Sequence, residues 1–376
     1  NSARSDIFEA VAKVCNSTGG QTSGSAVHIK GKYMLTANHV SNRTHVTFDG
    51  NNFFTRDAEF VPVKIGNTDM KLFKLTEDPS LPEKTLYTGT NGGVGSTATM
   101  IGWGRARNPN VSDPDFTNTN IWQWGNSSTE LKRWGTNRIE TSLNRMGPSG
   151  DYFDVLVTTL SPYAGNNEAG AAIYDSGSGL FVLNNGIWKL AGITSYVYSP
   201  TTPQGTSTNT STFHTNSNNR DLNFFVKIST YATQIEAAIP DISTYSGWKI
   251  DNSLYGNDAE HESDTDFDGV EQLLEFALGG DPNTNDLSIL PILSLVEYGG
   301  NTFLELTVTR PIGLQGITYI PQTTTDLSNW PNDSTGIDEP NPLPQDNADG
   351  TETLVYRRSQ PLSLIDDAFI RINILE

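Results

Sequence analysis

Three residue types that together perform nucleophilic catalysis lie far apart in this chain of 376 residues. His39 lies in the segment YMLTANHV, Asp69 precedes the run MKLFKL, and Ser176 lies between an aspartate and a glycine in AIYDSGSGLF. A serine hydroxyl becomes a nucleophile when a histidine takes its proton, a carboxylate fixes the tautomer of that histidine, and amide groups bind the developing oxyanion. The chain supplies a candidate histidine, a candidate carboxylate and a candidate serine, in the order His39, Asp69, Ser176.

Each of these residues also has a simpler interpretation. Asp, Ser and Gly are turn formers, a histidine at a strand end is usually a satisfied core residue, and an aspartate at the head of a strand is usually a cap or turn residue. The order of the three candidates differs from that of the α/β-hydrolases, which run Ser, Asp, His and carry a G-x-S-x-G motif that Ser176 lacks. The order and the flanking strand-like runs together favour the catalytic interpretation.

Strand-like segments make up most of the chain between Ser25 and Ile239. They are short runs of β-branched and aromatic residues separated by Gly, Asn and Pro, a pattern that predicts an antiparallel barrel or sandwich. Two polar stretches, residues 104–120 and 199–221, are interpreted as surface loops because strand-like sequence resumes after each. Residues 229–239 then change to helical spacing, with Ser229 as the predicted cap and Pro240 as the stop.

The segments around the three candidates resemble the corresponding segments of trypsin-like serine peptidases. LTANHV resembles L-T-A-A-H-C, TDMKLFKL resembles D-I-A-L-L-K-L, and YDSGSGLF resembles G-D-S-G-G-P-L. MIGWG, LAGITSY and FFVKISTYATQIEAAI are similar, in the same order, to the G-W-G start of the second barrel, the L-V-G-I-V-S-W strand and the terminal strand and helix. The resemblance covers about residues 10 to 240 and implies an all-β, two-barrel peptidase domain with a C-terminal helix.

This resemblance implies a role for each residue of the site. His39 is the general base, Asp69 orients it, and Ser176 is the nucleophile of an endopeptidase that works through an acyl-enzyme. The oxyanion hole is placed at the backbone N–H groups of Tyr174 and Ser176, with Asp175 buried behind the turn. Tyr174 replaces a glycine of the family, and its Cβ restricts the backbone geometry that donation requires. A catalytically impaired binding protein on the peptidase fold is therefore the alternative to an active enzyme.

The substrate pocket is also assigned by the resemblance. Gly170, six residues before Ser176, falls at the pocket floor, and the segment from Ser195 to Val197 forms the walls. Val197 stands at a usual glycine and shortens the pocket, which predicts a preference for small or medium uncharged side chains. A two-residue shift of the alignment brings Glu168 to the floor, and a basic preference is then the alternative.

The start of the chain lacks the I-V-G-G sequence of zymogen-activated relatives. In those relatives the freed amino group pairs with the buried aspartate, so Asp175 needs another partner or none. A latent form activated by cleavage after Arg4 is one hypothesis, and an enzyme that folds in its active form is the other.

An acidic motif follows the predicted end of the peptidase domain. Residues 264–275, DTDFDGVEQLLE, satisfy D-x-[DN]-x-[DN]-G-x₅-E at every required position. Glu271 takes a position where paired EF-hands carry an apolar residue, so the motif predicts a single structural Ca²⁺ site, with a solvated acidic turn as the alternative. The predicted oxygen ligands are Asp264, Asp266, Asp268, the carbonyl of Val270, and Glu275.

The chain is thus divided into three predicted parts. These are a peptidase domain over residues 1–240, a short helical connector with the calcium loop over 241–286, and a small β-sandwich over 287–376. The last two parts resemble modules near the C-terminus of secreted bacterial proteins. They imply surface attachment, contact with a secretion system or substrate binding, and a stabilising appendage is the alternative.

Composition limits the partners and the compartment. The 24 basic and 43 acidic residues give a net charge of −19, which repels nucleic acid and anionic membrane surfaces. No run of about twenty apolar residues predicts a membrane span, and a single cysteine, Cys15, excludes an internal disulfide. The acidic, Asn- and Thr-rich sequence and a start without Met or an apolar leader predict a secreted protein, extracellular or periplasmic, that acts on protein or peptide substrates.

Overall fold

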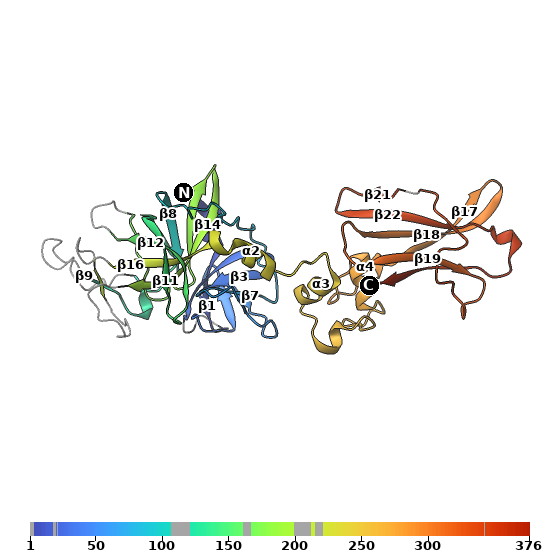
Figure 1. Cartoon of the computed structure of the whole chain (residues 1–376). Coiled ribbons are helices and arrows are strands. Elements are labelled where there is room, and N and C mark those ends of the chain that lie inside the picture. The colour runs from blue at the N-terminus through green and yellow to red at the C-terminus, as the bar shows by residue number, and fades with distance from the viewer. Residues whose placement is uncertain are drawn as a thin grey trace. The chain divides into compact units, whose positions relative to one another are not determined.

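The chain forms two compact units in this computed structural model, residues 1–239 and residues 240–376. In Figure 1 the first unit runs from blue to yellow and the second from gold to red. The structure describes residues 4–17, 20, 22–106, 121–160, 167–198, 212–214, 221–341 and 343–376, with the backbone alone described at 121–123 and 212–214.

The first unit contains an N-terminal antiparallel sheet of seven strands. Its strands are β1 (Val11–Cys15), β2 (Gly24–Lys30), β3 (Tyr33–Thr36), β4 (His45–Thr47), β5 (Phe53–Thr55), β6 (Val63–Lys64) and β7 (Lys71–Lys74). They follow the order β5-β4-β1-β2-β3-β7-β6, with β3 and β7 paired so that Thr36 lies opposite Lys71. Val14, Met34 and Phe73 pack together in the buried core of this sheet, which explains the apolar runs of these strands.

A second seven-stranded antiparallel sheet follows in the same unit. Its strands are β8 (Thr97–Gly102), β10 (Arg133–Arg138), β11 (Thr141–Met146), β12 (Tyr152–Thr159), β13 (Gly179–Asn184), β14 (Ile187–Tyr198) and β16 (Leu222–Lys227). The order is β10-β8-β13-β14-β16-β12-β11, and its core includes Leu156, Leu180 and Phe225. A further pair joins β9 (Ile121–Gln123) to β15 (Thr212–His214). Two antiparallel sheets and few helices confirm the predicted all-β, two-barrel fold class.

The described part of the first unit also contains two α-helices, α1 (Ser5–Glu9) and α2 (Ile228–Ala238). The predicted cap of α2 is wrong, because the helix starts at Ile228, one residue before Ser229, and Lys227 is its N-cap residue without a side-chain cap hydrogen bond. Ile228 is fully buried directly after β16, so the chain turns into the helix there. Among the described residues no helix is both long and apolar enough to span a membrane.

The second unit begins with two short helices, α3 (Tyr245–Asp251) and α4 (Gln272–Leu278). Rings from both helices pack together, with Tyr245 stacked on Trp248 at 5.9 Å between centroids and Phe276 at 5.5 Å from Tyr245. The strands are β17 (Ile292–Tyr298), β18 (Asn301–Pro311), β19 (Thr318–Thr324), β20 (Ile337–Asp338), β21 (Gln345–Asp346), β22 (Thr351–Arg358) and β23 (Phe369–Leu375).

The strands of the second unit pair in two groups. A five-stranded sheet runs β17-β18-β22-β20 with β21 also on β22, and β19 pairs with β23. Leu306, Val308 and Tyr356 form the core together with Leu278 of α4. Helix α4 and the strands therefore share one core, while the predicted boundary at residue 286 and the β-sandwich assignment stay predictions.

Candidate active site

Three loops of the first unit carry the candidate catalytic residues. His39 lies three residues after β3 and Asp69 two residues before β7 in the first sheet, whereas Ser176 lies three residues before β13 in the second. Because β3 and β7 are hydrogen-bonded neighbours, the His39 and Asp69 loops leave the sheet side by side. The backbone N–H of Asn38 donates to the carbonyl of Asp69 at 3.1 Å and joins the two loops directly.

A continuous chain of hydrogen bonds joins the three side chains. His39 Nδ1 lies 2.8 Å from Asp69 Oδ2, and His39 Nε2 lies 2.9 Å from Ser176 Oγ. The backbone N–H of His39 also donates to Asp69 Oδ1 at 3.1 Å. With the Nδ1 proton held toward Asp69, Nε2 is left to accept the proton of the serine hydroxyl. The structure thus brings together the three residues that the sequence placed in this order.

The Asp69 carboxylate is almost completely buried, with 1% of its surface exposed. A buried carboxylate needs hydrogen-bond donors to offset its lost hydration. One donor is the hydroxyl of Ser195, which bonds Asp69 Oδ2. The sequence places Ser195 only in the pocket wall and does not reveal this contact, because nothing local to β14 indicates which loop its hydroxyl meets.

The turn that carries Ser176 is tied to both sheets. The carbonyl of Ser176 accepts the N–H of Ser25 in β2 at 2.8 Å, and the N–H of Gly177 donates to the carbonyl of Thr194 in β14 at 2.8 Å. Gly177 has φ +86°, and a Cβ at this position would lie 2.0 Å from the carbonyl oxygen of Ser25. Glycine is therefore required after the nucleophile both by the backbone conformation and by the close approach of β2.

Tyr174 adopts the left-handed conformation despite its side chain. Its φ is +77°, its carbonyl accepts the Ser25 hydroxyl at 3.1 Å, and its ring lies under the Arg105 guanidinium at 5.0 Å from the centroid. Neither the Tyr174 N–H nor the Ser176 N–H donates a hydrogen bond to any residue that the structure describes. Two unpaired amides beside a nucleophile suit an oxyanion hole, and that role stays a prediction.

The Asp175 carboxylate accepts hydrogen bonds from two backbone amides. Its Oδ1 accepts the N–H of Gly104 at 2.8 Å, and its Oδ2 accepts the N–H of Ala172 at 2.8 Å. Burial raises the pKa of Asp175 to about 6, while the two backbone hydrogen bonds act in the opposite direction. Both carboxylate oxygens of Asp175 thus accept hydrogen bonds from backbone amides of the first unit.

Of the predicted pocket residues, only Ser195 is shown in contact with the nucleophile. The Ser195 carbonyl accepts the Ser176 hydroxyl at 3.4 Å, Val197 packs partly buried against the second core, and Gly170 is partly exposed. Glu168 is half-buried and pairs through a single bridge with Thr136. Parts of the neighbouring loops lie outside the described residues, so the preference for uncharged side chains stays a prediction, as does its basic alternative.

Replacing Tyr174 tests the left-handed turn. Tyr174→Gly relieves about 1–2 kcal/mol of Cβ strain and loses a cation–π contact of about 0.5–1 kcal/mol, so we expect kcat within about threefold of the wild type. Tyr174→Val places a β-branched residue where φ is +77°. If the Tyr174 N–H is the predicted oxyanion donor, its displacement lowers kcat about 10²-fold. Peptide hydrolysis by the two variants checks this, and equal kcat values would contradict it.

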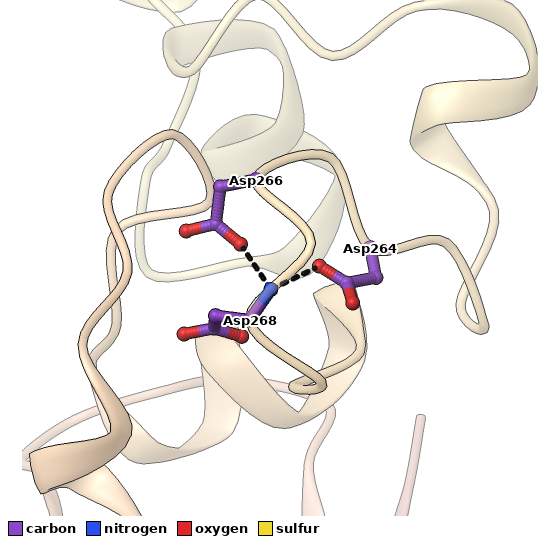
Figure 2. A group of neighbouring side chains, drawn as sticks. All are labelled: Asp264, Asp266 and Asp268. Atoms are coloured by element: carbon purple, nitrogen blue, oxygen red, sulfur yellow. Dashed lines mark hydrogen bonds between the residues drawn. The ribbon is translucent and has the colours of Figure 1, made fainter.

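The second unit carries a separate group of acidic side chains in the loop before α4. Figure 2 shows Asp264, Asp266 and Asp268 around the backbone N–H of Asp268, which lies 3.3 Å from Asp264 Oδ1 and 3.2 Å from Asp266 Oδ1. One carboxylate oxygen from each of the three lies within 4.8 Å of the others. The N–H of Val270, whose carbonyl is a predicted ligand, donates to Asp268 Oδ1 at 2.8 Å.

Glu275, the last motif residue, lies inside α4. It is 1% exposed, and its Oε1 has no hydrogen-bond partner among the described residues. Burial and the nearby carboxylates of Asp266 and Asp286 raise the pKa of Glu275 to about 8. An orphaned carboxylate oxygen among other carboxylates fits the oxygen-only donor set that Ca²⁺ takes.

An antiparallel two-sheet fold with a Ser–His–Asp chain of hydrogen bonds is the arrangement of the trypsin-like class. The family model described as Trypsin matches residues 3–217, more than half of the sequence. The chain belongs to the trypsin family.

Comparison with solved structures gives a more distant likeness. A structure described as the crystal structure of Rv3671c protease in an inactive form is 16% identical, with a TM-score of 0.39, and the match covers 63% of this chain and 92% of that chain. No curated protein matches this sequence.

Proposed function

We propose that the first unit is a serine endopeptidase that hydrolyses peptide bonds through Ser176, His39 and Asp69. The observation that carries the proposal is the chain of hydrogen bonds from Ser176 Oγ through the His39 ring to Asp69. Membership of the trypsin family supports the same reaction class. The substrate is a protein or peptide.

The proposed reaction begins with attack on the substrate carbonyl. Ser176 Oγ forms a bond to the carbonyl carbon while its proton passes to His39 Nε2, and the N–H groups of Tyr174 and Ser176 bind the oxyanion. Asp69 stabilises the resulting imidazolium. His39 then gives the proton to the leaving amine, and an acyl-enzyme remains. Water, deprotonated by His39, hydrolyses this ester and restores the serine.

Labelling with a fluorophosphonate probe tests the proposal, because such a reagent reacts only with an activated serine. The intact chain is expected to be labelled at Ser176, and Ser176→Ala abolishes labelling. Ser41→Ala, which removes an exposed serine two residues after His39, serves as the control and keeps it. A folded wild-type chain that is labelled neither intact nor after cleavage at Arg4 would instead indicate the catalytically impaired binding protein.

We further propose that the protein is secreted, extracellular or periplasmic, and that the second unit contacts a cell surface or a secretion system. The net charge of −19 and the Asn- and Thr-rich composition support the first proposal. The edge strand β17 supports the second, because Ile292, Leu295 and Tyr298 each have about two thirds of their surface exposed, and exposed apolar groups on a sheet edge favour association.

We also propose that the acidic loop binds one structural Ca²⁺ through the five motif ligands, Asp264, Asp266, Asp268, the Val270 carbonyl and Glu275. The ion would supply positive charge that offsets the repulsion among these carboxylates. The support is the clustered ligand atoms and the orphaned Glu275 oxygen.

A further inference from the structure

The acidic loop does not end with its motif. A second group of three carboxylates consists of Asp268, Glu275 and Asp286, with one oxygen from each within 4.8 Å of the others. Asp268 and Glu275 belong to the motif, whereas Asp286 lies eleven residues after its last position. The fold therefore brings a carboxylate from outside the motif to the motif's own ligands.

Three oxygens in this region lack hydrogen-bond partners among the described residues. They are Glu275 Oε1, Asp286 Oδ1 and Asp266 Oδ2, and each is buried as an atom. Glu275 is the most enclosed of these side chains, at 1% exposure. Carboxylates packed together without a cation repel one another and lose hydration. A divalent cation offsets both the repulsion and the lost hydration, because it carries the opposite charge and binds the carboxylate oxygens directly.

The segment that carries Asp286 is already held on the loop. The N–H of Asp286 donates to Asp268 Oδ2 at 3.0 Å, and the N–H of Asp281 donates to Asp286 Oδ2 at 3.2 Å. The Thr265 hydroxyl also bonds the carbonyl of Pro282. The 281–286 turn therefore presents Asp286 to the site without a rearrangement of the backbone.

We infer that Asp286 is a Ca²⁺ ligand, so that the ion ties the 281–286 turn to the 264–275 loop. The inference rests on the proposed calcium site. Ca²⁺ takes six to eight oxygens, and Asp286 adds a further carboxylate to the motif ligands. The ion then joins α4 to the start of the strand-containing part of the second unit, which begins at β17.

Calcium titration of the full chain tests this inference. In a Ser176→Ala background, which prevents self-digestion, Asp286→Asn is expected to weaken Ca²⁺ binding at least about tenfold, because one carboxylate ligand loses its charge. Asp258→Asn is the matched control, since Asp258 is an exposed carboxylate of the same unit outside both groups. The Ca²⁺ affinity of this variant is expected to stay within about twofold of the parent's.

Hydrogen exchange separates a lost ligand from a misfolded variant. In the parent chain Ca²⁺ slows amide exchange in both 264–275 and 281–286, whereas in Asp286→Asn saturating Ca²⁺ slows exchange only in 264–275. A parent chain that binds no Ca²⁺ at millimolar concentration would overturn the calcium site itself. Equal affinity and equal protection of 281–286 in Asp286→Asn would overturn the role of Asp286 alone.

Discussion

Asp69→Asn is expected to lower kcat about 10⁴-fold while the fold is kept. Asp69 accepts hydrogen bonds from His39 Nδ1 and from the backbone N–H of His39. An asparagine amide that donates toward Nδ1 forces the other tautomer, in which Nε2 carries a proton and cannot accept one from Ser176. The variant also removes the buried charge that stabilises the imidazolium.

Steady-state hydrolysis of a peptide found by library cleavage measures this effect. Asp151→Asn, which removes a partly exposed carboxylate paired with Lys64 at 2.7 Å, is the control, and its kcat stays within about twofold because exposed ion pairs contribute little. A loss of less than about tenfold in Asp69→Asn would mean that Asp69 does not orient the base, since the wrong tautomer alone costs far more.

Gly177→Ala is expected to destabilise the first unit by about 2–5 kcal/mol and to abolish activity. Left-handed backbone at an alanine costs about 1–2 kcal/mol, and overpacking adds about 1–3 kcal/mol. The added Cβ would lie 2.0 Å from the carbonyl oxygen of Ser25 and 2.3 Å from the Thr36 hydroxyl. Because Ser176 is the preceding residue, any shift that relieves this clash also moves the nucleophile from His39.

Gly95→Ala separates the cost of left-handed backbone from the cost of the Cβ clash. Gly95 has φ +91°, and a Cβ added at this residue would meet no atom within 4 Å, so this variant bears the conformational cost alone, about 1–2 kcal/mol. The loss of unfolding free energy in each of the two variants is measured by urea unfolding in the Ser176→Ala background. Hydrogen exchange of peptides from β2 and β13 follows the unfolding of the first unit. Equal destabilisation by the two substitutions would show that the contact with β2 is unimportant.

Much of the site was readable from short segments. TANHV, NTDMKLFKL and YDSGSGLF each combine an apolar strand with a polar turn at its end, so strand, turn and candidate residue are specified within about ten neighbouring residues. The helix after β16 is predictable for the same reason. Its first residue is not, because burial of Ile228 against the rest of the unit, and not the capping side chain, determines where the helix begins.

Other features depend on residues far apart in the chain. Ser195 reaches Asp69 across 126 positions, and Gly104 pairs with Asp175 across 71. The sequence predicts that the Cβ of Tyr174 restricts the backbone of the turn. Tyr174 nevertheless has a φ of +77°, with its ring beneath the Arg105 guanidinium. Asp286 likewise meets the acidic loop from outside the motif. No local pattern predicts such contacts, because they exist only after loops from different strands have been brought together.

The sequence by itself determined the trypsin-like strand pattern, the order of His39, Asp69 and Ser176, and the acidic motif, since periodicity, turn formers and ligand spacing are properties of neighbouring residues. The tertiary structure alone decided that the three side chains form one hydrogen-bonded chain, that backbone amides occupy Asp175, and that Asp286 meets Glu275. The physical reason is that hydrogen bonds and charge interactions act over a few ångströms in space, whatever the distance along the chain.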